Sequence, residues 1–432
     1  MKKTTKYRKN KMKFALMVPL LMLLLGACFS PWAGETDETQ LTIAFGTAGR
    51  VAVTEQELSG LNFEVILDGP GGKRTETFSG STTATLRVLP GIYHIIIRGI
   101  GVTPPVYTGF PARMLRVWGS YEANVQLRQN NHANIAIATA VEVTSWSQLT
   151  TAVNLADING RKTLIFFNND FSSSGNISIG GNRDISFLAE TPITINMLAP
   201  NNFTVANSGK LTLGENGMGG TLNFNGQNLN STTPLITVNN GGVLVMNDGI
   251  VLENRRNSGN GGAINTSGTF TMNGGMISGN RATQGGGVFI SSGQFILTSG
   301  TIYNNEASNG GGGVHISGIL TMNGGAIMNN RATGSNAIGG GIQAGGGFLM
   351  NGGVIGGNTT SGQGGGYGIP PGVRVVFSKT SGIIYGNDAP DGLRNLARNN
   401  TSGHAAFASA TQYRNRTAYE NDNVGAAFWT NN

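Results

Sequence analysis

Residues 261–280 read GGAINTSGTFTMNGGMISGN, and residues 286–305 read GGVFISSGQFILTSGTIYNN. Both stretches begin with Gly-Gly and then carry phenylalanine, glycine, isoleucine and asparagine at the same later positions. Similarity of a chain to itself at a fixed period of this length is typical of repeat architectures, in which each repeat stacks on the next. The two stretches therefore set the frame in which the rest of the chain is compared.

Four columns of this repeat recur six times along the chain. Successive asparagines are separated by 26, 25, 25, 28 and 29 residues. A glycine stands five residues before each asparagine, an isoleucine or valine three before (Val251 in the first repeat), and a phenylalanine or leucine ten before. The asparagine column is Asn254, Asn280, Asn305, Asn330, Asn358 and Asn387, and the glycine column is Gly249, Gly275, Gly300, Gly325, Gly353 and Gly382.

The period predicts how one repeat folds. About 25 residues at roughly 3.3 Å each form one coil of three short strands separated by corners. Equivalent side chains then stack in parallel, in-register sheets, so the Phe/Leu and Ile/Val columns become interior apolar ladders. The glycine column marks a corner that needs positive φ or close backbone approach. The asparagine column is typical of a structural amide ladder whose residues tolerate the left-handed conformation.

Composition favours the same fold class. The 432 residues include 68 glycines but only 13 prolines, which excludes collagen. Hydrophobic residues make up 39%, enough for a sizeable core, and charged residues only 12%. Many turn residues, few charges and an adequate core indicate a β-solenoid.

The positive charge of the chain lies at its N-terminus. Seven cations and no acid stand within residues 1–13, and the apolar run 14–25 is too short to span a bilayer. Residues 1–27 are therefore predicted to be a secretory signal peptide. Removing its seven cations from the 29 lysines and arginines leaves 22 cations against 22 anions. We therefore expect no nucleic-acid partner.

Cys28 is the only cysteine, and it ends the sequence Leu25-Gly26-Ala27-Cys28. This sequence resembles the lipobox of bacterial lipoproteins. The resemblance implies that Cys28 is acylated and anchors an exported chain to the bacterial cell envelope, at the outer membrane or cell surface. The alternative is a chance cysteine beside an ordinary cleavage site.

The chain is predicted to contain further units before the repeats. Residues 28–39 form a polar tether, and the short alternating strands of 40–143 resemble a small Ig-like or transthyretin-like β-sandwich. Its aromatic residues Tyr107, Trp118 and Tyr121 are interpreted as core or edge residues, with a sugar-stacking face as the alternative. Residues 144–160 form a helix that caps the first coil, and residues 161–432 form about ten coils with a C-terminal cap.

The repeats resemble a known family. Gly261-Gly262-Ala263-Ile264 followed by Phe270-Thr271-Met272-Asn273 reproduces the paired GGAI and FxxN repeats of the chlamydial polymorphic outer-membrane proteins. The resemblance implies a right-handed parallel β-helix on the cell surface and a role in adhesion. Those proteins end in a translocating β-barrel, for which this sequence shows no alternating ten-residue segments. The fold class predicted is thus all-β, a pectin-lyase-like right-handed solenoid after a small sandwich.

Sparse acids argue against catalysis. Right-handed β-helices also include polysaccharide lyases and hydrolases, which need clustered carboxylates. The best candidates for such a cluster are Glu215, Asp248 and Glu253. We identify no catalytic residue, cofactor site or metal site, and His315 has no evident partner. The predicted function is a non-catalytic adhesin or display stalk with a host, matrix or glycan ligand; the alternative is a carbohydrate-active enzyme.

The column that follows the asparagines has mixed charge. It contains Arg255, Arg281, Glu306, Arg331, Thr359 and Asp388. Because both signs occur, the column is interpreted as a solvated corner rather than as a row that binds acidic ligands.

Overall fold

The computed structural model describes residues 38–46, 55–102, 107–215, 220–371, 373, 375–385, 393–397 and 406–407. The predicted signal peptide, Cys28 and nearly all of the predicted tether lie outside these residues, as does the predicted C-terminal cap beyond residue 407. Strands account for 53% and helices for 4% of the structure, so the protein is all-β.

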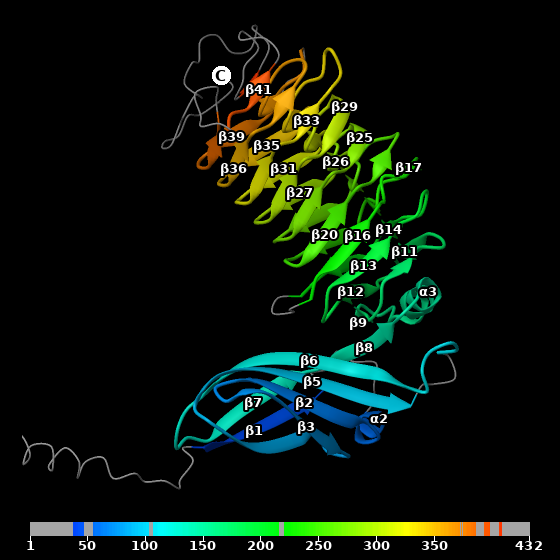
Figure 1. Ribbon diagram of the computed structural model, residues 1–432, viewed down its shortest axis with the longest axis vertical. Coiled ribbons are helices and arrows are strands. Elements are labelled where there is room, and N and C mark those ends of the chain that lie inside the picture. The colour runs from blue at the N-terminus through cyan, green and yellow to red at the C-terminus, as the bar shows by residue number, and fades with distance from the viewer. Residues whose placement is uncertain are drawn as a thin grey trace, which may run out of the picture.

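The first unit is a two-layered β domain (Figure 1). One layer has the strand order β4-β1-β7, and the other begins β3-β2-β5-β6-β8. Phe45 and Phe63 meet across the layers with ring centroids 4.5 Å apart. The elements are β1 (Thr39–Gly46), α2 (Glu55–Ser59), β2 (Asn62–Gly69), β3 (Gly72–Ser79), β4 (Thr83–Val88), β5 (Gly91–Val102), β6 (Arg113–Val125), β7 (Asn131–Ala136) and β8 (Ala138–Val143).

The second layer continues without a break into the repeats. Strand β8 pairs antiparallel with β6 on one side and parallel with β9 (Lys162–Phe167) on the other. From β8 onward every pair in this fourteen-stranded sheet is parallel. The domain and the repeats are therefore joined by sheet hydrogen bonds (Figure 1).

The repeats form a β-solenoid of about nine turns. Each regular coil contributes one strand to each of three long sheets and a short strand to a seven-stranded strip at one corner. The sequence predicts three strands per coil; the corner strip is an addition. We call the sheets the first, second and third faces, in the order in which the chain enters them.

The first face contains β9, β12 (Asp184–Leu188), β15 (Lys210–Leu213), β19 (Val243–Met246), β23 (Thr269–Met272), β27 (Gln294–Leu297), β31 (Ile319–Met322), β35 (Gly347–Met350) and β39 (Phe377–Lys379). The second face contains β10 (Phe171–Ser172), β13 (Ile193–Asn196), β16 (Leu222–Asn225), β20 (Ile250–Glu253), β24 (Met276–Ser278), β28 (Thr301–Tyr303), β32 (Ala326–Met328), β36 (Val354–Gly356) and β40 (Ile383–Ile384). The corner strip contains β17 (Asn230–Ser231), β21 (Arg256–Asn257), β25 (Arg281–Gln284), β29 (Glu306–Gly310), β33 (Arg331–Ala332), β37 (Thr359–Thr360) and β41 (Leu396–Ala397). The third face contains β11 (Ile177–Ile179), β14 (Phe203–Val205), β18 (Ile236–Val238), β22 (Ile264–Thr266), β26 (Val288–Ile290), β30 (Val314–Ile316), β34 (Ile342–Ala344), β38 (Tyr367–Gly368) and β42 (Ala406–Phe407).

Identical side chains stack inside the solenoid. Phe270 and Phe295 are paired in register, and their rings stack with centroids 4.5 Å apart. Met246 and Met272 are likewise paired, and both are fully buried. The periodic apolar residues of the sequence thus form one core that runs from the capping helix to Ile384.

In the first repeat, the strand pairing is shifted by one residue from the alignment of repeats made on the sequence. Leu252, not Val251, pairs with Ile277, because the step from Met246 to Leu252 is one residue longer than the step from Met272 to Ile277. Leu252 is fully buried, whereas Val251 is only partly buried. The prediction for Val251 was therefore wrong by one residue.

Helix α3 (Trp146–Leu155) covers the start of the solenoid core (Figure 1). The Ser145 hydroxyl accepts a hydrogen bond from the backbone N–H of Gln148 and so caps the helix N-terminus. Trp146, Leu149 and Val153 recur on one face and are buried. The Trp146 ring lies 5.3 Å from that of Phe203 in β14. The helix is shorter at both ends than residues 144–160.

Candidate functional site

A row of left-handed residues shapes the corner between the second face and the corner strip. Asn254, Asn304 and Asn329 have φ values of 58°, 53° and 56°, and Gly279 and Gly357 occupy equivalent places with φ of 65° and 66°. Asparagine and glycine are the residues that adopt this conformation at least cost. The following residue in each coil is buried, and the residue after that begins a strand of the corner strip.

A buried amide ladder lies directly behind this row. The Asn280 backbone N–H and side-chain Nδ2 both donate to Asn305 Oδ1 at 3.0 Å. Asn305 repeats these bonds to Asn330, and Asn330 repeats them to Asn358, at 2.9–3.0 Å. Each Nδ2 also donates to a backbone carbonyl of an adjacent coil. The ladder therefore satisfies buried polar groups from coil to coil.

The first and last residues of the ladder are not the ones predicted from the sequence. Arg255, not Asn254, donates its backbone N–H to Asn280 Oδ1, at 3.0 Å, because of the one-residue offset described above. Asn358 bonds to Asn395, while Asn387 lies outside the described residues. The left-handed conformation belongs to the residue before each of the ladder residues Asn280, Asn305, Asn330 and Asn358.

Arg255 is a fully buried cation at the first rung. Its Nη1 donates to the Met197 carbonyl at 3.1 Å, and its Nη2 donates to the Asn201 carbonyl. Burial lowers the pKa of Arg255 to about 10. The Arg255 guanidinium thus satisfies two backbone carbonyls of an earlier coil in the interior of the solenoid.

All six glycines of the predicted column adopt the positive φ that was expected from the sequence at this corner. Gly249, Gly275, Gly300, Gly325, Gly353 and Gly382 all have φ between 73° and 89°. At Gly300 an added Cβ would lie 2.8 Å from the Gly274 backbone, so both conformation and space require glycine there.

A groove of about 410 Å³ runs along the outside of the asparagine corner. Its strand side carries Arg256, Arg281, Glu306 and Arg331, one from each of four consecutive coils that pair in register. Its other side carries the left-handed row, including Asn254, Asn304 and Asn329. We call this feature the arginine groove.

The arginine groove has an excess of positive charge. Three exposed guanidinium groups face a single carboxylate, that of Glu306. Glu306 Oε2 lies 3.4 Å from Arg281 Nη2, and Arg256 Nε donates to Asn228 Oδ1 at 3.4 Å. Guanidinium groups bind carboxylates, sulfates and phosphates through paired N–H donors, and the amides add donors and acceptors for hydroxyl groups. The mixed-charge column of the sequence is thus one side of a concave, polar surface.

Several residues that line the arginine groove were not predicted from the sequence, namely Arg256, Asn304 and Asn329. The offset moves Arg256 into the column in place of Arg255, and Leu396 replaces Asp388, which lies outside the described residues. The signal was present as doubled residues, namely Arg255-Arg256, Asn304-Asn305 and Asn329-Asn330. In each pair one residue is buried behind the corner and its neighbour lines the groove.

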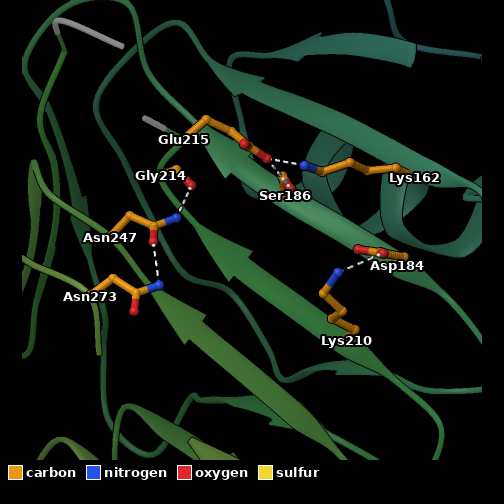
Figure 2. Close-up of polar contacts among 8 residues, drawn as sticks. All are labelled: Lys162, Asp184, Ser186, Lys210, Gly214, Glu215, Asn247 and Asn273. Atoms are coloured by element: carbon orange, nitrogen blue, oxygen red, sulfur yellow. Dashed lines mark hydrogen bonds and ion pairs between the residues drawn. The ribbon is translucent and has the colours of Figure 1, made fainter. Parts of the chain in front are cut away.

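The three carboxylates considered for an enzyme bind different partners. Glu215 forms an ion pair with Lys162 and accepts a hydrogen bond from Ser186 at 3.1 Å (Figure 2). Asp248 accepts a hydrogen bond from the Gly275 backbone N–H at 3.3 Å. Glu253 accepts hydrogen bonds from Asn223 and Asn225 at 2.8 and 3.0 Å. No hydrogen bond or ion pair links these acids to one another within the described part of the chain.

Figure 2 also shows polar contacts between neighbouring coils at the two ends of the first-face strands near the start of the solenoid. Lys210 Nζ lies 2.9 Å from Asp184 Oδ2, so opposite charges are paired there. At the other end of these strands, directly after β19 and β23, Asn273 Nδ2 donates to Asn247 Oδ1 at 3.1 Å, and Asn247 Nδ2 donates to the Gly214 carbonyl. The asparagine of the FxxN motif therefore joins consecutive coils.

His315 and Trp118, two further residues singled out in the sequence, are buried. His315 is buried, its ring stacks on Phe289 at 4.8 Å, and its Nδ1 lies 3.2 Å from Gln343 Oε1. Burial lowers the pKa of His315. Trp118 is buried against Phe166, Tyr107 is partly buried beside Phe110, and Tyr121 is exposed. Among the described residues, no group of three His, Cys, Asp or Glu is placed to hold a metal ion.

Comparisons with known proteins add no family. A scan against protein-family models, a search of curated proteins and a search of solved structures found no match to this chain. None of the helices in the described ranges has the length and hydropathy required to cross a bilayer.

Proposed function

We propose that this protein is a lipid-anchored, non-catalytic binding protein of the bacterial cell envelope, an adhesin or a display stalk. The observation that carries the proposal is the arginine groove, a charged surface repeated over consecutive coils of a regular scaffold. A solenoid adds length with each coil while its cross-section stays the same, which suits the presentation of such a surface. The lipobox residue Cys28 would supply the anchor, and an outer-membrane or cell-surface location follows from it.

We also propose a fold class for each of the two parts of the chain. We assign the solenoid to the right-handed, pectin-lyase-like parallel β-helices, which is supported by the GGAI and FxxN repeats together with the parallel in-register pairing. We assign the first domain to the Ig-like or transthyretin-like sandwiches on its two packed layers and their shared apolar core.

The test compares bacteria that express the full chain with bacteria that express Cys28→Ser. We expect the full chain to sediment with membranes, to incorporate labelled fatty acid and to make cells adhere to surfaces coated with matrix or glycan. Cys28→Ser should lose all three properties. Membrane attachment by Cys28→Ser, or absence of adhesion to every surface, would count against the proposal.

Purified chain without the lipid anchor, residues 29–432, tests the enzymatic alternative. The soluble chain is incubated with polyuronates, glycosaminoglycans and peptidoglycan in the presence of calcium, and product size is followed over a day. We expect the polymers to stay intact. Shortening that depends on the protein would replace the binding role by catalysis and direct attention to Glu215, Asp248 and Glu253.

A further inference from the structure

The charged side chains of the arginine groove lie in one line with a regular spacing. Arg256, Arg281, Glu306 and Arg331 pair in register from strand to strand, so they form a line parallel to the solenoid axis. Neighbouring strands lie about 4.8 Å apart, so the line of four side chains is about 14 Å long at its backbone. A ligand that follows this line must be an extended chain rather than a compact small molecule.

The charges along this line do not all have the same sign. Arg281 and Arg331 are two coils apart, about 10 Å, and Glu306 lies between them. A polymer with a negative charge at every coil would place one charge against Glu306. A polymer with charges about two coils apart would meet a guanidinium at each charge and Glu306 at a neutral unit.

The opposite side of the groove fits neutral, hydroxyl-rich units. Asn254, Asn304 and Asn329 each offer an amide with donors and an acceptor, and Glu306 can accept hydrogen bonds from hydroxyl groups. None of the described residues that line the groove is aromatic, so the choice of ligand rests on charge spacing. A nucleic acid carries a phosphate at every nucleotide and would place one of these charges against Glu306. These features favour a polysaccharide over a nucleic acid.

We propose that the arginine groove binds a linear acidic polysaccharide in which charged and neutral sugars alternate. The chain lies parallel to the solenoid axis, with anionic groups at Arg281 and Arg331 and a neutral sugar opposite Glu306. Arg256 extends the site at one end. The inference rests on the proposed binding function and names the chemical class of its ligand; the anionic groups are carboxylates or sulfates.

Binding is measured by calorimetry with four probes of matched length. These are a hyaluronan oligosaccharide and a κ-carrageenan oligosaccharide, in which a carboxylated or a sulfated sugar alternates with a neutral sugar, a polygalacturonate oligosaccharide, which is charged at every sugar, and a single-stranded oligonucleotide. We expect the two alternating glycans to bind at least tenfold more tightly than the other two probes, and their relative affinities separate carboxylate from sulfate recognition. Equal or tighter binding of polygalacturonate or of the oligonucleotide would overturn the inference.

Variants locate the binding in the groove. Arg331→Gln should weaken binding of the alternating glycans about tenfold, because one paired, charge-assisted contact is lost. Glu306→Gln should raise the affinity for polygalacturonate more than that for hyaluronan, because the repulsion at the middle coil is removed. Arg113→Gln removes an exposed guanidinium from β6, outside the groove, and should leave binding unchanged. Circular dichroism and thermal unfolding establish that each variant is folded.

Two results separate this inference from the proposed function. If cells that carry Arg331→Gln adhere as well as wild type and no alternating glycan binds, the inference is wrong and the adhesive role stands. If the soluble protein binds alternating glycans through Arg331 but cells carrying the full chain adhere to nothing, the groove stands and the adhesive role is wrong.

Discussion

At the scale of single residues, the amide ladder holds the asparagine corner together. Asn305 is 1% exposed and takes part in bonds to Asn280, to Asn330 and to the Ile277 carbonyl. Removal of one ladder asparagine leaves buried polar groups on both sides without a hydrogen-bond partner. Each unpaired buried polar group costs about 1–3 kcal/mol. The ladder is therefore expected to contribute more to stability than exposed amide pairs of similar geometry.

Asn305→Ala tests this expectation. The free energy of unfolding should fall by about 3 kcal/mol, because the Asn280 N–H and the Ile277 carbonyl lose their partner. The measurement is urea unfolding followed by circular dichroism. Asn351→Ala is the matched control, since Asn351 Nδ2 also donates to an asparagine of the preceding coil, Asn323 Oδ1 at 3.0 Å, but both residues are exposed. Equal losses in the two variants would show that burial of the ladder contributes nothing.

Asn305→Asp adds a pH dependence with a definite sign. The new carboxyl oxygen would face two acceptors, the Ile277 carbonyl and Asn330 Oδ1, so the folded protein favours the protonated acid. Its pKa in the folded state should rise above the unfolded value of about 3.9. The variant should therefore be closest to wild type below pH 4 and lose stability as pH rises through the folded pKa. A stability difference from wild type that stays constant between pH 3.5 and pH 7.5 would contradict this account.

The glycine corner yields a second prediction at this scale. Gly300 has φ of 89°, and a Cβ there would lie 2.7 Å from Met272 Cε and 2.8 Å from the Gly274 carbonyl group. Gly300→Ala should lower the free energy of unfolding by about 1–3 kcal/mol. Gly175→Ala is the control, because no atom lies within 4 Å of a Cβ at that position. Thermal unfolding of both variants, with no difference between them, would show that the corner tolerates a side chain.

Residue patterns predict the columns well but not their phase. The Phe/Leu and glycine columns could be read from spacing because each imposes one chemical requirement, apolarity or positive φ. Val251 and Asn254 were placed one residue out, since an added residue before Leu252 leaves the local pattern acceptable in either phase. Only the pairing of strands from different coils shows that Arg255, and not Asn254, starts the ladder.

At the scale of elements, helix α3 protects the first coil. Leu149 is fully buried, and Trp146 packs its ring against Phe203. A solenoid without such a cover would expose an apolar cross-section at its end. The helix could be predicted from its apolar spacing and Ser145 cap, because both signals are local. The corner strip could not, because its strands have two to five residues and show no periodicity of their own.

Leu149→Ala should therefore destabilise the start of the solenoid first. The expected loss is about 2–4 kcal/mol, from lost burial and the cavity that remains. Hydrogen exchange should show loss of protection in β11 and β14, while β27 and β31 keep theirs. Leu155→Ala, at a side chain that is 40% exposed, serves as the control. Uniform loss of protection along all coils would mean that α3 is no local cap.

At the scale of the whole molecule, the first domain and the solenoid behave as parts of one sheet. A boundary at residue 143 is a reasonable inference from composition, yet β8 pairs with both β6 and β9. A change from antiparallel to parallel pairing depends on distant partners, so the sequence of β8 alone does not reveal it. The joint also carries charge. Arg98 forms an ion pair with Glu142 of β8, and its Nη1 lies 3.5 Å from Glu190 and 4.0 Å from Glu64.

This cluster predicts how the joint responds to pH. Burial raises the pKa of Glu142; Arg98 opposes this shift, while Glu190 and Glu64 add to it. Arg98→Met keeps the packing but removes the cation that opposes this shift, so the folded pKa of Glu142 should rise further above its unfolded value of about 4.3. The folded state then favours bound protons. The loss of stability should be small near pH 4 and grow as pH rises through the folded pKa of Glu142.

Denaturant unfolding at pH 4 and pH 7.5 measures this difference. We expect a deficit of about 1–2 kcal/mol at pH 7.5, a modest value because Arg98 keeps a fifth of its side-chain surface exposed. Arg74→Met is the control: its pair with Glu76 spans 4.0 Å with both side chains about two-fifths exposed, and its effect should stay below about 0.5 kcal/mol. If Arg98→Met is as stable as wild type at pH 7.5, the continuous sheet alone holds the domain to the solenoid. If its deficit persists at pH 4, lost packing rather than carboxylate repulsion accounts for it.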